Sequence, residues 1–279
     1  MDAQSTPESI IMAALSTLTS SQLSSLSHSL STAFHRHNNH LTSLLTSPTL
    51  FTHTLNHLYS LSLPQKSLLI ARHLLSFLRF LTPFFISSPP TLNSNRVRLC
   101  DLDSVLLLLF FCEVRQHHPT LLETSPAEWQ GILKNYCFNT MLNLSACVVT
   151  PFQVLGVFVD LVLKCRRFVT SKGCGIDPGR KEVAASAEAV VALPSVQVSK
   201  GCGGVECVIC KDEMREGRDV CQLPCQHLFH WMCVLPWLSK RNTCPCCRFL
   251  LPTDDVYGEI ERLWSAIVKV GLQVSQECC

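Results

Sequence analysis

Six cysteines and two histidines have the residue types and the spacing of metal ligands. In chain order they are Cys207, Cys210, Cys225, His227, His230, Cys233, Cys244 and Cys247. A closed structural site for Zn²⁺ takes four nitrogen or sulfur donors, so eight such residues predict two tetrahedral zinc sites. A segment of roughly 40 residues buries too little apolar surface to fold alone, and bound metal supplies the missing stability. A closed site has no open position for water, so we expect the zinc ions to be structural.

The ligand order resembles the RING-type zinc finger of ubiquitin ligases, in the subclass with histidine at the fourth and fifth ligand positions. The resemblance implies that the ligands interleave, with Cys207, Cys210, His230 and Cys233 on one zinc ion and Cys225, His227, Cys244 and Cys247 on the other. The nearest alternative is a PHD finger, whose fourth ligand is cysteine and whose fifth is histidine. His227 argues against that alternative.

The resemblance also implies an enzyme that binds a ubiquitin-conjugating enzyme charged with ubiquitin. A RING favours the geometry in which a substrate lysine attacks, which is catalysis by positioning without a covalent intermediate on the ligase. Ile209, Trp237, Leu238 and Pro245 match the apolar contacts to the partner, and Arg248 matches the basic residue that bonds both enzyme and ubiquitin. Two alternatives stay open. The apolar side chains could only fill the small core, and the RING could be a scaffold or dimerisation module without transfer activity.

The remaining cysteines give no second framework. The chain has 17 cysteines, and those outside the predicted sites are scattered, which favours a reducing compartment over a disulfide scaffold. Cys246 lies between the last two ligands and could compete for zinc or act as a nucleophile. No histidine or acidic residue stands beside it in the sequence, so we expect a surface thiol.

For residues 1–168 the sequence predicts an all-α domain, which we expect to direct the protein to its cellular location or to select a substrate or partner. Apolar residues recur three and four apart, and hydroxyl residues followed by proline mark helix starts. These starts are Ser5-Thr6-Pro7, Ser47-Pro48, Ser125-Pro126 and Thr150-Pro151. We expect loops at Asn38-Asn39, at residues 87–90 and at His117-His118-Pro119. The group His35, His37 and His40 could bind a metal, but a solvated turn beside Asn38-Asn39 is the preferred interpretation.

The rest of the chain divides by composition. Residues 169–204 are rich in glycine and predict a flexible linker with a short helix. The RING module follows over residues 205–250. Thr253 is the predicted N-cap of a C-terminal helix within residues 251–279. An apolar stripe on that helix, from Val256 to Val270, is expected to pack on its own domain, with pairing between chains as the alternative.

Charge and hydropathy exclude some partners. The net charge is +2, and residues 201–250 carry both signs, so no basic stripe points to nucleic acid. The apolar run Val105–Cys112 is far shorter than the roughly 20 residues that cross a bilayer, so a membrane span is not expected.

The N-terminal part contains no Asp or Glu from Ser9 to Cys100. Such acid-poor, hydroxyl-rich segments are typical of plastid transit peptides, but the helix signals favour a folded domain. The helices, the run from Leu99 to Leu109 and the tail from Leu251 to Val256 resemble the plant ubiquitin ligases of shoot gravitropism that associate with amyloplasts. This likeness implies a plastid location. Because ubiquitin and its charged carriers are cytosolic, it implies work on the cytosolic side, with the cytoplasm as the alternative.

Overall fold

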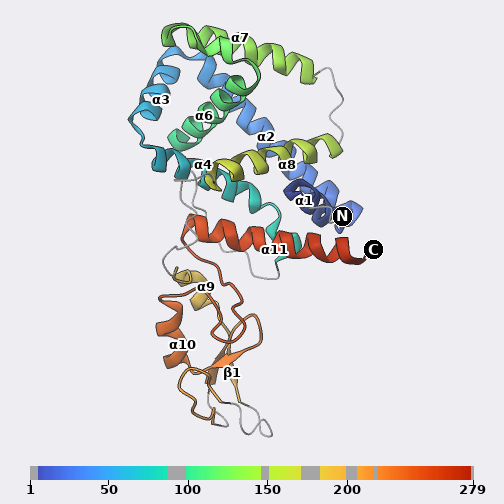
Figure 1. Ribbon diagram of the computed structural model, residues 1–279, viewed down its shortest axis with the longest axis vertical. Coiled ribbons are helices and arrows are strands. Elements are labelled where there is room, and N and C mark those ends of the chain that lie inside the picture. The colour runs from blue at the N-terminus through green and yellow to red at the C-terminus, as the bar shows by residue number, and fades with distance from the viewer. Residues whose placement is uncertain are drawn as a thin grey trace. The chain divides into compact units, whose positions relative to one another are not determined.

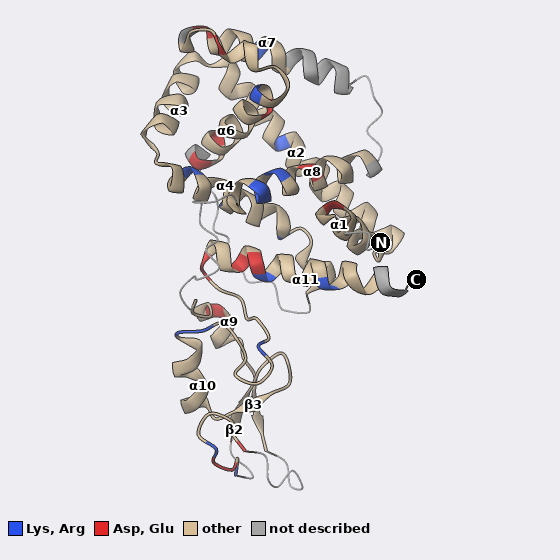
Figure 2. Cartoon of the chain, viewed as in Figure 1, with Lys and Arg blue, Asp and Glu red and all other residues tan. Residues whose placement is uncertain are grey.

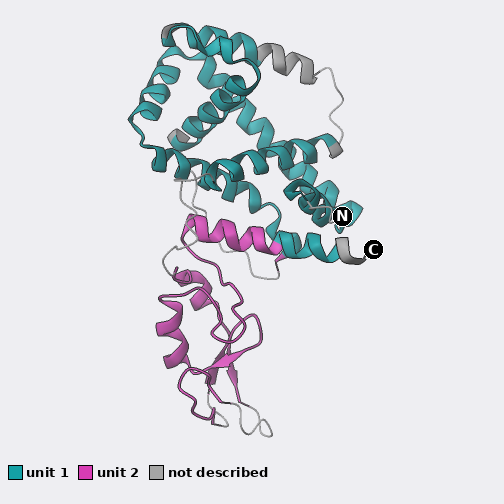
Figure 3. Ribbon diagram, viewed as in Figure 1, with its two compact units in different colours: residues 1–85, 95–176, 267–279 teal, residues 86–94, 177–266 magenta. Residues whose placement is uncertain are grey.

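The computed structural model describes residues 6–86, 99–145, 151–170, 183–198, 206–215 and 219–277. The chain forms two compact units (Figure 3). The helical unit comprises residues 1–85, 95–176 and 267–279, and the sheet unit comprises residues 86–94 and 177–266. This division falls within the last helix of the chain, so that helix contributes residues to both units.

The described residues of the helical unit confirm the all-α prediction (Figure 1). Its elements are α1 (Pro7–Ser16), α2 (Ser20–Thr46), α3 (Pro48–Ser60), α4 (Leu63–Leu78), α5 (Thr82–Phe85), α6 (Leu99–His117), the 3₁₀ turn η1 (Pro119–Leu122), α7 (Pro126–Ser145) and α8 (Pro151–Thr170). Helix α2 packs against α3, α6, α7 and α8, and α4 packs against α6 and α8. The apolar faces of these helices meet in the core of the unit, where Phe77 and Phe158 are fully buried.

Hydroxyl caps followed by proline begin the helices largely as predicted. Ser47 accepts a hydrogen bond from the Leu50 N–H, and Pro48 is the first residue of α3. In α1 the cap is Thr6. Ser5, Thr150 and residues 87–90 lie outside the described residues. The start of α2 was not predicted; there Thr19 and Gln22 satisfy each other's backbone N–H groups in a capping box.

The predicted loop at Asn38-Asn39 is wrong, because α2 continues through both residues. Asparagine disfavours a helix by less than 1 kcal/mol, which tertiary packing can override. Here the histidines of the same segment supply that packing. The His37 ring lies 5.2 Å from the His73 ring, and His40 Nδ1 lies 3.4 Å from an Asp103 carboxylate oxygen. The predicted break near His117 is confirmed, since α6 ends there.

Three polar contacts tie the first turns of α6 to three other helices. His40 on α2 pairs with Asp103, and Arg72 on α4 lies 3.9 Å from Asp101. His57 on α3 makes a hydrogen bond of 2.9 Å to the buried Ser104 hydroxyl. Charged residues are otherwise sparse along α1 to α4 (Figure 2).

The sheet unit is built on a three-stranded antiparallel sheet in the order β1-β2-β3. The strands are β1 (Ser195–Gln197), β2 (Asp219–Gln222) and β3 (Leu228–Phe229), and the helices are α9 (Ala187–Val191) and α10 (Trp231–Leu238). A flexible linker with a short helix was expected over residues 169–204. The described residues 183–198 hold the expected short helix, α9, and also a strand, β1, that pairs with β2.

Helix α11 (Val256–Glu277) buries most of its predicted apolar stripe, including Ile260, Leu263 and Ile267. Its N-cap is Asp255, whose carboxylate accepts the Gly258 N–H, and the prediction of Thr253 at this position is wrong. No helix in the described part of the chain has both the length and the apolar character needed to cross a membrane.

Candidate metal centres

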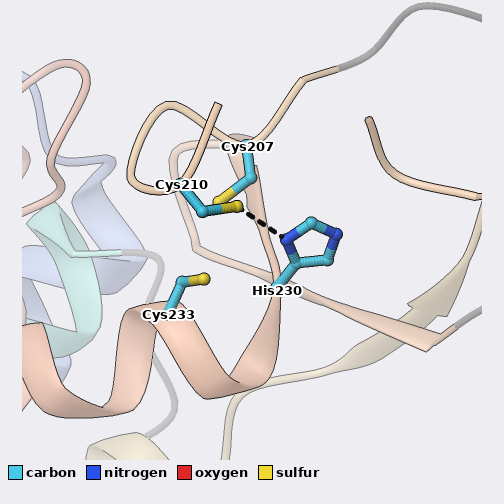
Figure 4. A group of neighbouring side chains, drawn as sticks. All are labelled: Cys207, Cys210, His230 and Cys233. Atoms are coloured by element: carbon cyan, nitrogen blue, oxygen red, sulfur yellow. Dashed lines mark hydrogen bonds between the residues drawn. The ribbon is translucent and has the colours of Figure 1, made fainter. Parts of the chain in front are cut away.

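The first predicted ligand set converges on one point in the sheet unit (Figure 4). Its members are Cys207, Cys210, His230 and Cys233. Their ligand atoms all lie within 4.8 Å of one another, and Cys210 Sγ lies 3.3 Å from His230 Nδ1. His230 precedes α10 and Cys233 lies in its first turn, so this helix delivers two of the four donors.

The second set is assembled in the same way. Its members are Cys225, His227, Cys244 and Cys247, again with all ligand atoms within 4.8 Å of one another. The His227 Nδ1 faces Cys225 Sγ at 3.3 Å. Cys225 and His227 come from the turn between β2 and β3, whereas Cys244 and Cys247 follow α10. The two sets of four ligands are therefore the interleaved sets that the sequence predicts.

The donor chemistry of both sets fits Zn²⁺. Three sulfur atoms and one imidazole nitrogen make a Cys₃His site, and four such ligands lie about 3.5–3.8 Å apart around one tetrahedral ion. The observed upper limit of 4.8 Å leaves room for that arrangement. Two structural zinc ions are the cofactors that these residues hold.

Electrostatics explains why a cation belongs here. Burial, and beyond it the neighbouring Cys244 and Cys247 thiols, raise the pKa of Cys225 to about 12 in the metal-free chain. Burial and the adjacent Cys210 thiol raise the pKa of Cys233 to about 11. These two thiols resist ionisation because they are partly buried and because the neighbouring thiols would repel their negative charge. A bound dication reverses this preference and holds the thiolates.

The two cysteine pairs Cys207/Cys210 and Cys244/Cys247 end in the same backbone conformation. The residue after each pair has a positive φ, 64° at Lys211 and 62° at Arg248. Each closes its turn by donating its N–H to the first cysteine carbonyl, Lys211 to Cys207 at 2.6 Å and Arg248 to Cys244 at 3.0 Å. The left-handed conformation is unfavourable for residues with a Cβ, and these two hydrogen bonds help to hold it.

Three of the predicted partner contacts are accessible. The side chain of Ile209, between the first two ligands, is 36% exposed, and Pro245, between the last two, is half-buried. Trp237 on α10 is also half-buried. Arg248 is exposed directly after the last ligand. Each of these residues is therefore fixed near a zinc site by the short chain that joins it to a ligand.

The structure does not place Leu238 with them. Its side chain is 1% exposed and belongs to the core of the sheet unit. Val234, one helical turn earlier, is buried on the same face, as residues four apart on a helix are. The accessible leucine of α10 is Leu235, 39% exposed, which the sequence analysis did not select. The four-residue spacing from Val234 could have shown that Leu238 faces inward.

The Trp237 ring is held by its surroundings. Its indole N–H donates a 2.7 Å hydrogen bond to the Thr243 carbonyl. The Arg241 guanidinium lies 4.7 Å from the ring centroid, in cation–π geometry. The hydrogen bond thus fixes the orientation of the indole, and Arg241 lies over one of its faces.

The two additional cysteines of the module differ in burial. Cys246 is exposed, in agreement with the expected surface thiol, and its backbone N–H points to the Cys244 sulfur at 3.4 Å. Cys221 is fully buried on β2, and burial raises its pKa to about 11. Neither belongs to the ligand sets found among the described residues.

Comparison with known proteins agrees with this geometry. Residues 205–248 match the Ring finger domain family. Over 273 residues, 93% of this chain and 95% of the relative, the sequence is 49% identical to the E3 ubiquitin-protein ligase SGR9, amyloplastic, of Arabidopsis thaliana. The E3 ubiquitin-protein ligase RNF181 of Xenopus laevis is 50% identical over 72 residues, 25% of this chain and 46% of the relative. The chain belongs to the family of RING-type E3 ubiquitin-protein ligases and is a RING-type E3 ubiquitin transferase.

Proposed function

We propose that this protein binds a ubiquitin-conjugating enzyme charged with ubiquitin and promotes transfer of the ubiquitin to substrate lysines at the plastid surface. The observation that carries the proposal is that apolar side chains a few residues from ligands of both zinc sites stay partly accessible. They are Ile209, Trp237 and Pro245, and the exposed Arg248 directly follows the last ligand. Aromatic and aliphatic side chains of this kind are the usual anchors of a protein interface.

The proposed roles follow from the chemistry of each group. The zinc ions, when bound, hold the shape of the module and supply no nucleophile, because four protein ligands close each site. Ile209, Trp237 and Pro245 bind the conjugating enzyme. Arg248 has five N–H donors in a planar fork, which suits simultaneous hydrogen bonds to the enzyme and to ubiquitin. Holding both partners in one geometry lowers the entropic part of the barrier.

The proposed location at the plastid surface is supported by similarity along most of the chain to a relative whose name contains "amyloplastic". We assign the location to the helical unit, because the RING segment is shared with relatives that match only about a quarter of this chain. A fluorescent full-length fusion should decorate plastids, whereas residues 177–266 alone should be diffuse. Plastid decoration by residues 177–266 would contradict this assignment.

An autoubiquitination assay of the full chain with a panel of charged conjugating enzymes tests the activity. Transfer with at least one carrier, lost on removal of zinc, is the expected result. Binding of a carrier without transfer by any member of the panel would favour the alternative of a RING scaffold.

A further inference from the structure

We infer that residues 183–198 form a brace that holds helix α10, and with it Trp237, in the orientation that binding of the charged conjugating enzyme requires. The inference rests on the proposed function. The Ring finger match begins at residue 205, so the brace lies outside it. Nevertheless Leu193, Val198 and Ser186 of the brace are buried, and its two ends reach the two ends of α10.

At the C-terminal end of α10, the brace supplies a hydrogen-bond donor. The last carbonyl groups of a helix have no partner within the helix. The Trp237 carbonyl accepts the Lys240 and Arg241 N–H groups, which follow α10 directly. The Leu238 carbonyl instead accepts the Ala185 N–H from the brace, at 2.9 Å. The brace therefore fixes the residue adjacent to Trp237.

The same part of the brace bonds the chain that follows the second zinc site. The Ser186 N–H donates to the Pro252 carbonyl at 2.8 Å. The buried Thr253 hydroxyl donates to the Ala184 carbonyl at 2.7 Å. Residues 184–186 thus join α10 to residues 252–253.

From residues 252–253 the contacts continue to the Trp237 indole. Leu251 and the buried Asn242 are linked by two hydrogen bonds, of 2.6 Å between backbone groups and 2.9 Å from Asn242 Nδ2. The next residue, Thr243, accepts the Trp237 indole N–H. The brace consequently acts on Trp237 by two routes, through Leu238 and through the loop that holds the ring.

At the N-terminal end of α10, the brace contacts Trp231, the first residue of the helix. The Trp231 indole N–H lies 3.2 Å from the Ser195 hydroxyl on β1. Strand β1 is itself fixed by pairing with β2 and by the Gln222 N–H, which donates to the Pro194 carbonyl at 3.1 Å. An eight-residue helix is about 12 Å long. Contacts at both ends over that length control the direction of the helix as well as its position.

Two pairs of variants in the full chain test the brace. Ala185→Pro removes the N–H that bonds Leu238, whereas the control Ala187→Pro places proline at the first position of α9, which tolerates it. Thr253→Val removes the hydroxyl that bonds Ala184, whereas Thr253→Ser restores it. Since Thr253 also accepts the Asp255 N–H, Asp255→Ala serves as a control for fraying of α11.

Three quantities are measured: zinc content, single-turnover discharge of ubiquitin against the concentration of charged carrier, and hydrogen exchange at the Trp237 indole N–H. For Ala185→Pro and Thr253→Val we expect two zinc ions, an unchanged maximal rate and about a two- to tenfold higher half-saturating concentration, the effect of one lost hydrogen bond. Indole exchange should quicken in both. The control and Thr253→Ser variants should behave as the native chain.

The inference would be overturned if Ala185→Pro and Thr253→Val both had the native half-saturating carrier concentration and the native rate of indole exchange. Loss of zinc from both would also overturn it, because the segment would then be a general part of the folded core. If the native chain discharges no carrier, the proposed function fails, and indole exchange still decides whether the brace holds Trp237. Loss of discharge in Trp237→Ala, together with a native half-saturating concentration and native indole exchange in both brace variants, would leave the proposed function intact and refute the brace.

Discussion

Arg248 offers the sharpest test of transfer activity, because the chain contains a matched control for its substitution. Arg248→Ala removes a guanidinium and keeps a Cβ at a residue whose φ is 62°. Lys211→Ala does the same after the other cysteine pair, where φ is 64° and the N–H makes the equivalent bond to a ligand carbonyl. Both variants remove one positive charge beside one zinc site. The cost of the left-handed backbone is unchanged in each, so zinc content should stay at two.

The two variants should differ in catalysis. An exposed arginine that bridges enzyme and ubiquitin contributes one or two charge-assisted hydrogen bonds, each about 1.5–3 kcal/mol. Losing one such bond slows transfer by about tenfold to two hundredfold, since 1.4 kcal/mol corresponds to a factor of ten. Lys211→Ala should discharge at nearly the native rate. Arg248→Lys keeps the charge without the planar fork and should be intermediate.

A single-turnover assay of ubiquitin discharge onto free lysine, at saturating charged carrier, measures this difference directly. Carrier binding should be nearly unchanged, because in the proposed role Arg248 bridges the enzyme and ubiquitin during transfer, whereas Ile209, Trp237 and Pro245 bind the carrier. Equal rates for the Arg248→Ala and Lys211→Ala variants would refute the reasoning. Arg248 would then be only a counter-charge for the zinc thiolates.

Three further predictions concern the metal, the partner surface and acid stability. Cys207→Ser removes a ligand from the first zinc site. The energy of zinc binding, on the order of 10 kcal/mol in zinc peptides, stabilises the folded module. Elemental analysis should therefore find fewer than two zinc ions, and circular dichroism should show an unfolded sheet unit. Ile209→Ala and Trp237→Ala should keep both zinc ions and lose transfer; activity of both variants with every responsive carrier would contradict the assigned surface. Burial, assisted by the charge of His37, lowers the pKa of His73 to about 3. Its stabilising contribution is therefore complete above about pH 6.5 and lost as the pH falls below that value, by up to about 1.4 kcal/mol per pH unit. Urea unfolding should show that His73→Phe weakens this acid dependence, leaving the part that the partly buried His37 contributes, and that substituting the exposed His53 by glutamine does not change it.

The zinc ligands could be predicted because their signal is local. Cysteine pairs two residues apart constrain their own geometry, and the structure brings together all eight predicted ligands. The helix starts could be predicted for the same reason, because the signal is local: Ser47 caps a helix that begins at the adjacent Pro48. In each case the residues that determine the feature lie within one turn of one another.

Features that depend on distant partners could not be predicted. Nothing near Asn38 indicates that His40 will meet Asp103, 63 positions later, yet such contacts keep α2 helical. The brace had a weak signal, because Leu193 and Val198 frame a short alternating segment. Its hydrogen bonds to Leu238 and Pro252, however, use backbone groups that every residue carries. Side-chain patterns give no information about pairing of that kind.

The last helix limits how the two functions can be separated experimentally. Residues 267–279 belong to the helical unit, and a Cβ at Gly271 would clash with the Ile10 carbonyl of α1. Only glycine permits so close an approach, which makes the end of α11 part of the packing of the helical unit. A fragment that ends after α8 removes this packing, so its failure to reach plastids would not identify the targeting residues. Point variants such as Arg248→Ala, which leave both units intact, separate location from transfer more cleanly.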